Sequence, residues 1–350
     1  MRCLGIESTA HTFACSIINL DNNSKQSIAR LLSDIRDTYI PSKGSGIHPR
    51  EASRHHGQVA HSVLLTALKK AGSSIKDVDV IAYSAGPGLG PCLRVGAVVA
   101  RTLATYYKKA LLPVNHALGH IELGAVLTGA SDPIVLLVSG GHTMILAYSQ
   151  KRWRIFGETL DITLGQLLDQ FGRCLGFASP CGDQIESLAE KSGSNFSQLP
   201  YVVKGNDVSF SGLLTAAIQN ISKKKNSIQD LCYSLQETAF AMTTEALERA
   251  VSFTSKSEVL VVGGVAANKR LREMIEGACN RQGVKFRVCP PKFAGDNGVQ
   301  IAWVALLDNK IHQQYIPLEG SFVNQAWRVD SIDVNWRDCS PLTDLSLSVF

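Results

Sequence analysis

The sequence of 350 residues predicts an α/β protein of two lobes, in which one lobe duplicates the other. Strand-like apolar stretches alternate with longer helical ones, which is typical of α/β lobes. The chain is too long for one ordinary core, so two lobes of about 100 to 200 residues are expected. The pattern Ser-x-x-His-Thr occurs at 8–12 and again at 139–143, both times between two strand-like segments. This repeat predicts two hairpins in equivalent places on either side of a cleft.

The first lobe is expected to span residues 1–128 and to begin with a hairpin. Apolar residues at 2–6 and 13–20 flank a turn of small polar residues, which predicts two paired strands. The elements expected next are a helix at 53–70, a buried strand at 78–84, a glycine-rich loop at 86–91 and a helix at 93–108. The turn-rich segment 129–133 then separates the lobes.

The second lobe is expected to span residues 129–312 and to open with the repeated hairpin, whose strands fall at 133–138 and 144–148. Its further elements are expected to be helices at 164–175 and 228–254, a strand at 259–262, a helix at 267–280, a strand at 285–289 and a last helix at 297–307. We expect the last helix to pack back on the first lobe. The tail, residues 313–350, is expected to be irregular.

Composition argues against a membrane-spanning or exported chain. Hydrophobic residues make up 45% of it, but no apolar window is long enough for a spanning helix. The few apolar residues before Glu7 are too short for a secretory signal, so a cytoplasmic location is expected. Nine cysteines without a C-x-x-C pair predict reduced thiols, most of them small core residues. The net charge of +5 permits a polyanionic partner without requiring one.

The two Ser-x-x-His-Thr turns are candidate phosphate sites. Small residues let backbone N–H groups approach an anion, and hydroxyls add donors. The residues Gly263 and Gly264, before a helix with Asn268 one turn further on, form a third candidate contact. The alternative at all three places is an ordinary tight turn.

His116 and His120 are candidate metal ligands because their i, i+4 spacing puts both on one helical face. Asp296, exposed by small neighbours at the start of the last helix, can supply an anionic third ligand. The zinc-protease pattern H-E-x-x-H is absent, since Ala117 occupies the place of its glutamate. A purely structural histidine pair is the alternative.

Two carboxylates, Asp169 and Glu186, lie on either side of the segment 181–183 and can accept hydrogen bonds from a ribose or a base. Surface carboxylates without such a role are common, so this alternative stays open. His55, His56 and His61 fall in the expected helix at 53–70 and are interpreted as structural.

Together these motifs resemble one family, the universal tRNA threonylcarbamoyladenosine transferases. The matching segments are IESTAHT (6–12), RHH (54–56), GPGLGPCLRVG (86–96), NHALGHIE (115–122), LLVSGGHT (136–143), GETLDITLGQLLDQFGRCLG (157–176), VSFSGL (208–213), GGVAANKRLR (263–272), GDNGVQIAW (295–303) and VDSIDVNWRD (329–338). The segments ESTAHT and GPGLGPCLRVG are similar to the archaeal and eukaryotic branch, which is related to bacterial TsaD and works in the KEOPS complex. The residues after Asp338 fall outside the pattern.

This resemblance implies the duplicated actin, Hsp70 and sugar-kinase fold, with a nucleotide and a metal in the cleft between its lobes. It also implies transfer of a threonylcarbamoyl group from threonylcarbamoyl-AMP, made by another enzyme, to N6 of the adenosine 3′ of the anticodon in tRNAs that read ANN codons. A small protein kinase subunit and a small dimerising subunit are the implied partners beside tRNA.

The family's metal ligands fall on His116, His120 and Asp296, for one divalent ion, Fe²⁺ by resemblance with Zn²⁺ as an alternative. Its contacts with threonylcarbamoyl-AMP or ATP fall on Leu137, Val138, Ser139, Gly140, Gly141, Asp169, Gly182, Glu186 and Asn268. Archaeal members usually carry a metal-binding Tyr where this chain has Leu137, which resembles the bacterial and mitochondrial version. The fourth metal position is therefore expected to belong to water or ligand.

Two other functions remain as alternatives. A small-molecule kinase or ATPase of the same fold uses similar phosphate turns, but it usually holds Mg²⁺ with carboxylates and waters and lacks the paired histidines. A non-catalytic nucleic-acid-binding protein or scaffold explains the basic charge but leaves the combination of two histidines and an aspartate without a role.

Overall fold

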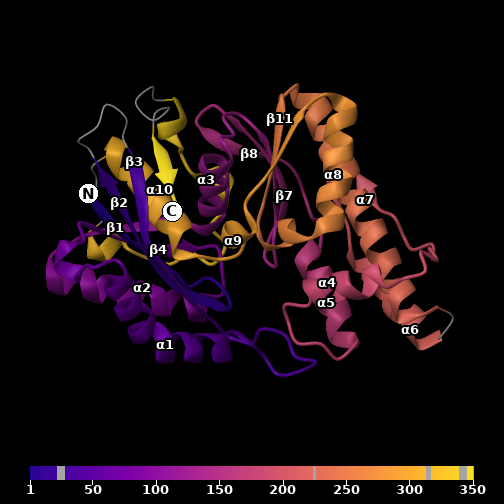
Figure 1. Ribbon diagram of the computed structural model, residues 1–350, viewed down its shortest axis with the longest axis horizontal. Helices are drawn as coiled ribbons and strands as arrows, with labels where there is room; N and C mark the ends of the chain where they lie inside the picture. Colours follow the sequence, from indigo (N-terminus) through magenta and orange to yellow (C-terminus); the bar gives the residue numbers. More distant parts are fainter. Residues whose placement is uncertain (22–27, 224–225, 313–316, 339–344, 350) are drawn as a thin grey trace.

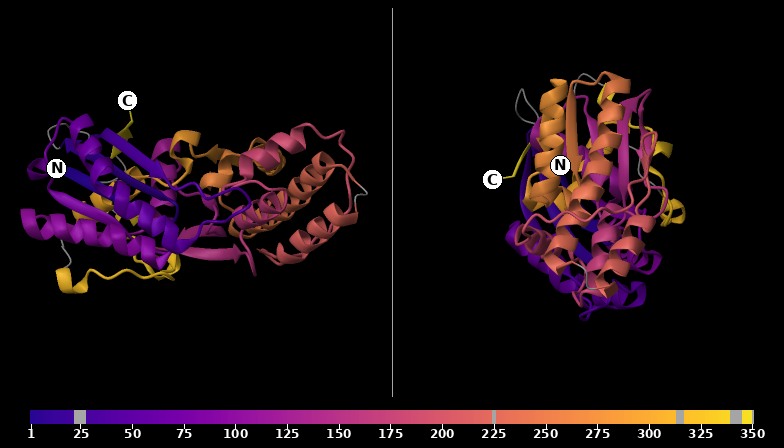
Figure 2. Two further views of the ribbon diagram at one scale, coloured as in Figure 1. Left: turned by 90° about the horizontal axis from the view of Figure 1, so that it is seen from below. Right: turned by 90° about the vertical axis from the view of Figure 1, so that its right-hand side faces the viewer.

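A computed structural model describes residues 1–21, 28–223, 226–312, 317–338 and 345–349 of the chain. The molecule is elongated and consists of two lobes (Figure 1). The first contains the N-terminal strands with α1 and α2, and the second contains α4 to α8. The views of Figure 2 show that the lobes follow one another along the longest axis.

The N-terminal sheet is built on the predicted hairpin. β1 (Arg2–Glu7) and β2 (Thr12–Asp21) pair antiparallel, and β1 also pairs in parallel with β4 (Val80–Gly86). β3 (Ile28–Thr38), β5 (Ala110–Asn115) and β13 (Ser346–Ser348) complete the sheet in the order β13-β3-β2-β1-β4-β5. The carboxyl ends of the parallel strands β1, β4 and β5 therefore meet at one edge, where side chains from separate segments converge.

The C-terminal sheet repeats this arrangement. Its order is β12-β11-β6-β7-β8, formed by β6 (Ile134–Val138), β7 (Thr143–Ser149), β8 (Arg152–Glu158), β11 (Glu258–Val262) and β12 (Lys285–Val288). The hairpin β6–β7 has the position that β1–β2 has in the first sheet, and β11 lies parallel to β6 as β4 does to β1. The predicted duplication is confirmed by this matching strand order.

The helices cover the sheets in layers. They are α1 (Pro49–Lys70), α2 (Gly90–Tyr107), α3 (His116–Thr128), α4 (Leu164–Cys174), α5 (Gly182–Glu190), α6 (Ser211–Lys223), α7 (Ile228–Thr254), α8 (Lys269–Gln282), α9 (Pro291–Ala294) and α10 (Gly298–His312). One hydrophobic cluster lies between α1, α2 and the first sheet, another between the second sheet and α4 to α8. A third fills the middle layer between the sheets.

The middle layer consists of α3 and α10, which pack against each other. α10 covers the first sheet, and α3 contacts strands of both sheets. α10, from the end of the second half, lies so close to β1 that a Cβ on Gly5 would come within 2.2 Å of the Gly298 carbonyl oxygen. α3, from the end of the first half, approaches β11, where a Cβ on Gly124 would meet Val262 at 2.5 Å. Each half therefore supplies one helix to the boundary with the other.

The described part of the tail is more ordered than predicted. β13 pairs in parallel with β3, and short 3₁₀ turns lie at Leu318–Gly320, Val329–Ser331 and Asn335–Asp338. Arg337 makes an ion pair with buried Glu122 of α3 at 2.8 Å, and its guanidinium lies over the Trp153 ring of β8. The expectation of an irregular tail is wrong at these places because buried partners fix the backbone.

Several other expectations need correction. β3, β5 and β8 were not predicted, and α1 begins at Pro49, four residues before the expected Ser53. Proline is favoured at the first helical position, so the earlier start has a physical reason. Seven of the eight described cysteines are buried as predicted, whereas Cys174 is exposed. Within the described chain, no helix is both long and apolar enough to cross a membrane.

Candidate functional site

The helix α3 begins directly after β5, which fixes where its two histidines lie. Asn115 caps the helix, because its side-chain oxygen accepts a hydrogen bond of 3.0 Å from the Leu118 amide. His116 and His120 therefore occupy the first two turns and share one face, as the spacing predicts. Both are buried where the two lobes meet.

The structure brings these histidines together with Asp296, which precedes α10. The Nε2 atoms of His116 and His120 lie 3.6 and 3.4 Å from Asp296 Oδ1. The three ligand atoms are all within 4.8 Å of one another, a spacing at which they could hold one ion. The Nε2 atom of His120 is buried and has no hydrogen-bond partner in the described chain. A buried nitrogen that faces a carboxylate without forming a well-aligned hydrogen bond fits a metal ligand well.

The other ring nitrogen of His116 is held by polar side chains. Its Nδ1 lies 2.9 Å from Glu7 Oε2 at the end of β1, and 3.1 Å from the side-chain nitrogen of Gln300 on α10. Glu7 itself is fully buried. A carboxylate that accepts the Nδ1 proton fixes the ring so that Nε2 is free to bind a metal. Glu7 was not predicted to belong to the site. The indication that the sequence offers is a single carboxylate at the end of an apolar strand.

Electrostatic effects on the three groups are strong. Burial works to lower the pKa of His116, but the carboxylates of Glu7 and Asp296 outweigh it and raise that pKa to about 9. Burial lowers the pKa of His120. Burial works to raise the pKa of Asp296, but the two histidines hold it well below its usual range. Asp296 is therefore a carboxylate, which is the form that binds a cation.

The turn between β6 and β7 faces this group from the second lobe. The His142 ring stacks on His116 with ring centroids 6.2 Å apart. Burial, followed by the nearby His116 and His120, lowers the pKa of His142 to about 3, so its ring is neutral. Gly140 and Gly141 are exposed, and a Cβ on either would have no neighbour within 4 Å. This turn therefore leaves open space beside its backbone.

Two predicted nucleotide contacts have side chains that point elsewhere. Leu137 and Val138, the last residues of β6, are fully buried and pack in different hydrophobic clusters. Ser139 is also buried, and its Oγ accepts hydrogen bonds from the amides of Gly141 and His142 at 3.2 and 3.0 Å. Of the five predicted residues at 137–141, the two glycines are the exposed ones.

The corresponding turn of the first lobe differs from the expected phosphate site. The amide of Ser8 donates to Ser84 Oγ at 2.9 Å, and that of Thr9 donates to Glu7 Oε1 at 2.6 Å. The adjacent carboxylate also repels an anion. This turn supports His116, and the expectation that it offers free amides to phosphate is not met at Ser8 and Thr9.

The remaining predicted contacts lie in the second lobe. Asp169 accepts from the Cys181 amide at 2.7 Å, just before Gly182 opens α5. Glu186 accepts from the Lys269 amide at 2.7 Å, so α5 and the start of α8 are in contact. Burial raises the pKa of both carboxyl groups. Asn268 is buried, caps α8 and donates to Gln236 at 2.8 Å.

Strands β6 and β11 are neighbours, so the turn that follows β6 lies close to the turn that follows β11. Gly263 has φ of +95°, and a Cβ there would lie 2.2 Å from the Val138 carbonyl oxygen. The turn after β6 and the Gly264–Ala267 3₁₀ turn therefore lie side by side at the carboxyl edge of the second sheet. Ligands of α/β proteins commonly bind at such an edge.

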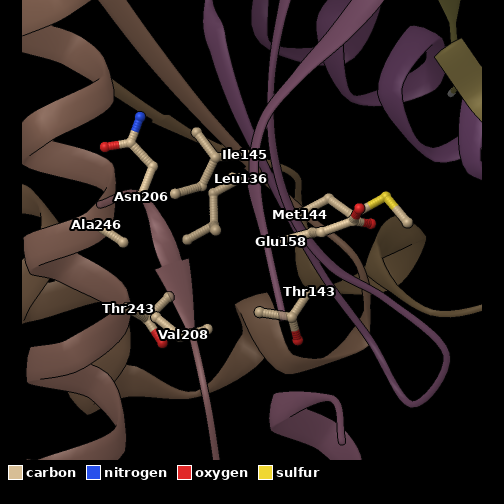
Figure 3. A pocket seen from close by; sticks show the side chains of 10 residues that line it. Leu136, Thr143, Met144, Ile145, Glu158, Asn206, Val208, Thr243 and Ala246 are labelled. Carbon is tan, nitrogen blue, oxygen red and sulfur yellow. The ribbon is translucent and has the colours of Figure 1, made fainter. Parts of the chain in front are cut away.

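A pocket in the second lobe lies between strands β6 and β7 and helix α7 (Figure 3). Its lining residues are Leu136, Thr143, Met144, Ile145, Gly157, Glu158, Asn206, Val208, Thr243 and Ala246. None of them belongs to the His-His-Asp group, and Thr143, which ends the second Ser-x-x-His-Thr turn, is the one lining residue shared with the predicted phosphate and nucleotide contacts. We interpret this pocket as a packing gap between the sheet and α7.

Comparison with solved structures identifies the fold. The chain is similar to HypF of T. kodakarensis, with a TM-score of 0.58 and 14% identity over 92% of this chain and 48% of that one. It is also similar to component A of the (R)-2-hydroxyglutaryl-CoA dehydratase of Acidaminococcus fermentans, with a TM-score of 0.53 and 14% identity over 87% of this chain and 97% of that one. These likenesses, with the duplicated sheets, confirm the actin-like fold.

Comparison of sequences identifies the family. The TsaD profile, tRNA N6-adenosine threonylcarbamoyltransferase, matches residues 30–303. A protein of that name from Sulfurisphaera tokodaii is 48% identical over 96% of this chain and 99% of its own length. One from Metallosphaera sedula is 48% identical over 97% of this chain and 100% of its own length. The chain therefore belongs to the TsaD family of tRNA N6-adenosine threonylcarbamoyltransferases, which are acyltransferases.

Proposed function

We propose that this chain transfers the threonylcarbamoyl group of threonylcarbamoyl-AMP to N6 of the adenosine 3′ of the anticodon, in tRNAs that read ANN codons. The observation that carries the proposal is the His116, His120 and Asp296 group, found at the lobe boundary of a chain 48% identical to named transferases along nearly its whole length. In the reaction, the N6 amine attacks the carbamoyl carbonyl, the bond from that carbon to the phosphate oxygen breaks, AMP leaves, and one N6 proton is released to solvent.

The same three residues would hold one divalent ion, Fe²⁺ by family resemblance or Zn²⁺. A bound ion of this kind supplies Lewis-acid stabilisation to oxygens that gain charge. The chain's own contribution is to fix the ligand side chains. Glu7 accepts the Nδ1 proton of His116, and the buried setting keeps competing water away.

The adenylate is proposed to lie on the second lobe. Gly140, Gly141 and Gly182 offer backbone approach without side-chain obstruction. Asp169 and Glu186 can accept hydrogen bonds from hydroxyl groups of a ribose. Since His142 of this lobe stacks on His116, the adenylate and the ion would be adjacent, so binding places the carbonyl for attack.

Partners and location follow from the family resemblance. We propose that the chain works in the cytoplasm within a KEOPS-like complex, beside a small kinase subunit and a small dimerising subunit. The lack of a spanning helix in the described chain is compatible with this setting.

The experiment that tests the proposal is a transfer assay on unmodified tRNA. Purified chain, the enzyme that makes threonylcarbamoyl-AMP and candidate partner subunits are combined, and modified adenosine is measured after nuclease digestion. Modification that requires this chain supports the proposal, and absence of modification in the complete mixture contradicts it. Elemental analysis of the same protein tests the ion, since full activity without a bound metal rules out its role.

A further inference from the structure

One segment of the first lobe reaches across to the second beside the candidate site. We call residues 39–48, which connect β3 to α1, the bridging loop. Its first amide, from Tyr39, donates to the His11 carbonyl at 2.8 Å. Further along, the Gly44 amide donates to the Phe177 carbonyl at 3.0 Å. Figure 1 shows the loop extending from the start of α1 toward α4 and α5.

The bridging loop also contacts the segment that precedes α5. The Ser179 amide donates to the Ser45 carbonyl at 3.4 Å. Gly46 packs against the guanidinium group of Arg173, so that a Cβ there would lie 3.4 Å from its carbon. Since Arg173 donates to Ser179 Oγ at 3.1 Å, these contacts form one connected group. The loop therefore runs from the turn at 8–12 to within two residues of Cys181, the partner of Asp169.

The bridging loop and the helix ends beside it carry unpaired positive charge. The exposed basic residues are Lys43 of the loop, Arg50 and Arg54 in the first two turns of α1, and Arg94 at the start of the second turn of α2. We call these four residues the basic rim. Arg50 and Arg54 lie one turn apart on the same face, and the carbonyl of Pro49 contacts Cys92 Sγ at 3.7 Å, which places the two helix starts together.

Acidic residues are nearly lacking in these segments. Residues 39–58 contain Glu51 alone, and residues 86–107 contain no acidic residue. None of the four basic side chains takes part in an ion pair or a side-chain hydrogen bond with the rest of the described chain. Most other arginines of the molecule are paired, for example Arg36, Arg152 and Arg287. Unpaired exposed cations on one edge create a field that attracts a polyanion.

We propose that the basic rim binds the phosphate backbone of the tRNA, next to the nucleotide whose base enters the site. The inference rests on the proposed function, which requires a tRNA loop at the lobe boundary. A base can reach His116 only if the flanking backbone lies against the residues around the boundary. The rim has the charge for this contact, and Ile40, 75% exposed on the same loop, provides an apolar surface for a base or ribose.

The test compares two variants of equal charge change in the full-length chain. The rim variant carries Lys43→Gln, Arg50→Gln, Arg54→Gln and Arg94→Gln. The control variant carries Lys69→Gln, Lys70→Gln, Lys76→Gln and Lys108→Gln, which are exposed residues at the opposite ends of α1 and α2 or just after them. Binding of unmodified tRNA transcript is measured at several salt concentrations, and metal content is measured on each protein.

The rim variant should bind tRNA at least about tenfold more weakly at low salt, and the slope of log affinity against log salt should fall by about 3, since each phosphate contact contributes roughly 0.7 to 0.9. The control variant should stay near the wild-type chain, and metal content should be unchanged in both. Equal losses in the two variants, or unchanged binding by the rim variant, overturn the proposal. The wild-type chain could bind tRNA through the rim while the complete transfer mixture leaves that tRNA unmodified. This result would contradict the proposed function but support the RNA-binding surface.

Discussion

The turn after β1 and the turn after β6 occupy the same place in the duplicated fold and share the Ser-x-x-His-Thr pattern. The residues on either side of the serine differ between the two turns. The residue before the serine is Glu7 in the first turn and Val138 in the second. Glu7 is a buried carboxylate bonded to His116, whereas Val138 packs in a hydrophobic cluster. The positions after the serine are Thr9 and Ala10 in the first turn but Gly140 and Gly141 in the second.

This difference shows how a duplicated lobe acquires two functions. The carboxylate in the first turn favours a cation nearby, and its neighbouring amides are already bonded. The glycines of the second turn keep the space beside the backbone open. We infer that the first turn serves the metal and the second turn serves the nucleotide.

The largest effect is expected when the ligands themselves are removed. His116→Ala or His120→Ala should abolish stoichiometric metal and lower transfer at least about a hundredfold. The matched control is His55→Ala, whose ring bonds Asp37 outside the group, and it should keep the metal. Elemental analysis, transfer assays and circular dichroism are the measurements. A folded, fully active, metal-free His120→Ala protein would contradict the assignment.

Glu7→Gln tests the first turn directly. The amide is a weaker acceptor for the Nδ1 proton of His116, so metal affinity should fall by roughly 10- to 100-fold while the fold persists. Val138→Ala is the equivalent change in the second turn. It should cost about 1.6 kcal/mol of unfolding free energy through two lost methyl groups and leave metal affinity unchanged. Similar metal loss in both variants would remove the distinction between the turns.

Gly140→Ala and Gly141→Ala test the second turn. Each new methyl group has open space, so stability should change by less than about 1 kcal/mol, whereas adenylate binding should weaken by roughly tenfold because the methyl blocks close approach. Metal content should not change. Gly263→Ala is the contrasting variant, because its positive φ and the nearby Val138 carbonyl should make it strongly destabilising. Calorimetry of nucleotide binding and thermal unfolding separate these outcomes.

The smallest effect on activity is expected at His56, which packs against Phe13 just beyond the first turn. Burial lowers its pKa from 6.5 to about 4, so the unfolded chain binds a proton that the folded chain does not. The free energy of unfolding should therefore fall by about 3 kcal/mol as the pH decreases from 6.5 to 4, and this contribution is fully present above pH 6.5.

His56→Leu should flatten that pH dependence, because no proton can be taken up at the position on unfolding. His61→Leu, at an exposed position of the same helix, is the control and should retain the wild-type slope. Denaturant unfolding at several pH values is the measurement. Identical slopes for the wild-type chain and His56→Leu would show that this histidine is not held neutral.

The duplicated hairpins and the long helices could be predicted from the sequence because their signals are local. The expected helix at 228–254 agrees with α7 at both ends. β3 and β8 escaped prediction because polar residues such as Arg36 and Arg154 interrupt their apolar pattern. β13 could not be predicted, since three residues acquire strand structure through pairing with β3 far away in the chain.

In the candidate site, too, the features with a local sequence pattern could be predicted and those that depend on tertiary packing could not. The i, i+4 spacing predicts that His116 and His120 share a face. The small neighbours of Asp296 made it a candidate third ligand, and the family resemblance pointed to the same residue. Glu7, Gln300 and Thr9 surround His116 through tertiary packing alone, so no spacing in the sequence relates them. Leu137 and Val138 were expected to contact the nucleotide, but only the fold reveals that their side chains are buried.

The position of α10 has a consequence for biosynthesis. This helix lies about 290 residues after β1 in the sequence, yet it covers the face of that strand. During synthesis, the face of β1 and β2 that α10 covers therefore stays exposed until α10 has been made, and such an exposed apolar surface favours aggregation or capture by a chaperone. Nascent chains stalled before Gly298 should accordingly be protease-sensitive in β1 and β2, and those that include α10 should be protected.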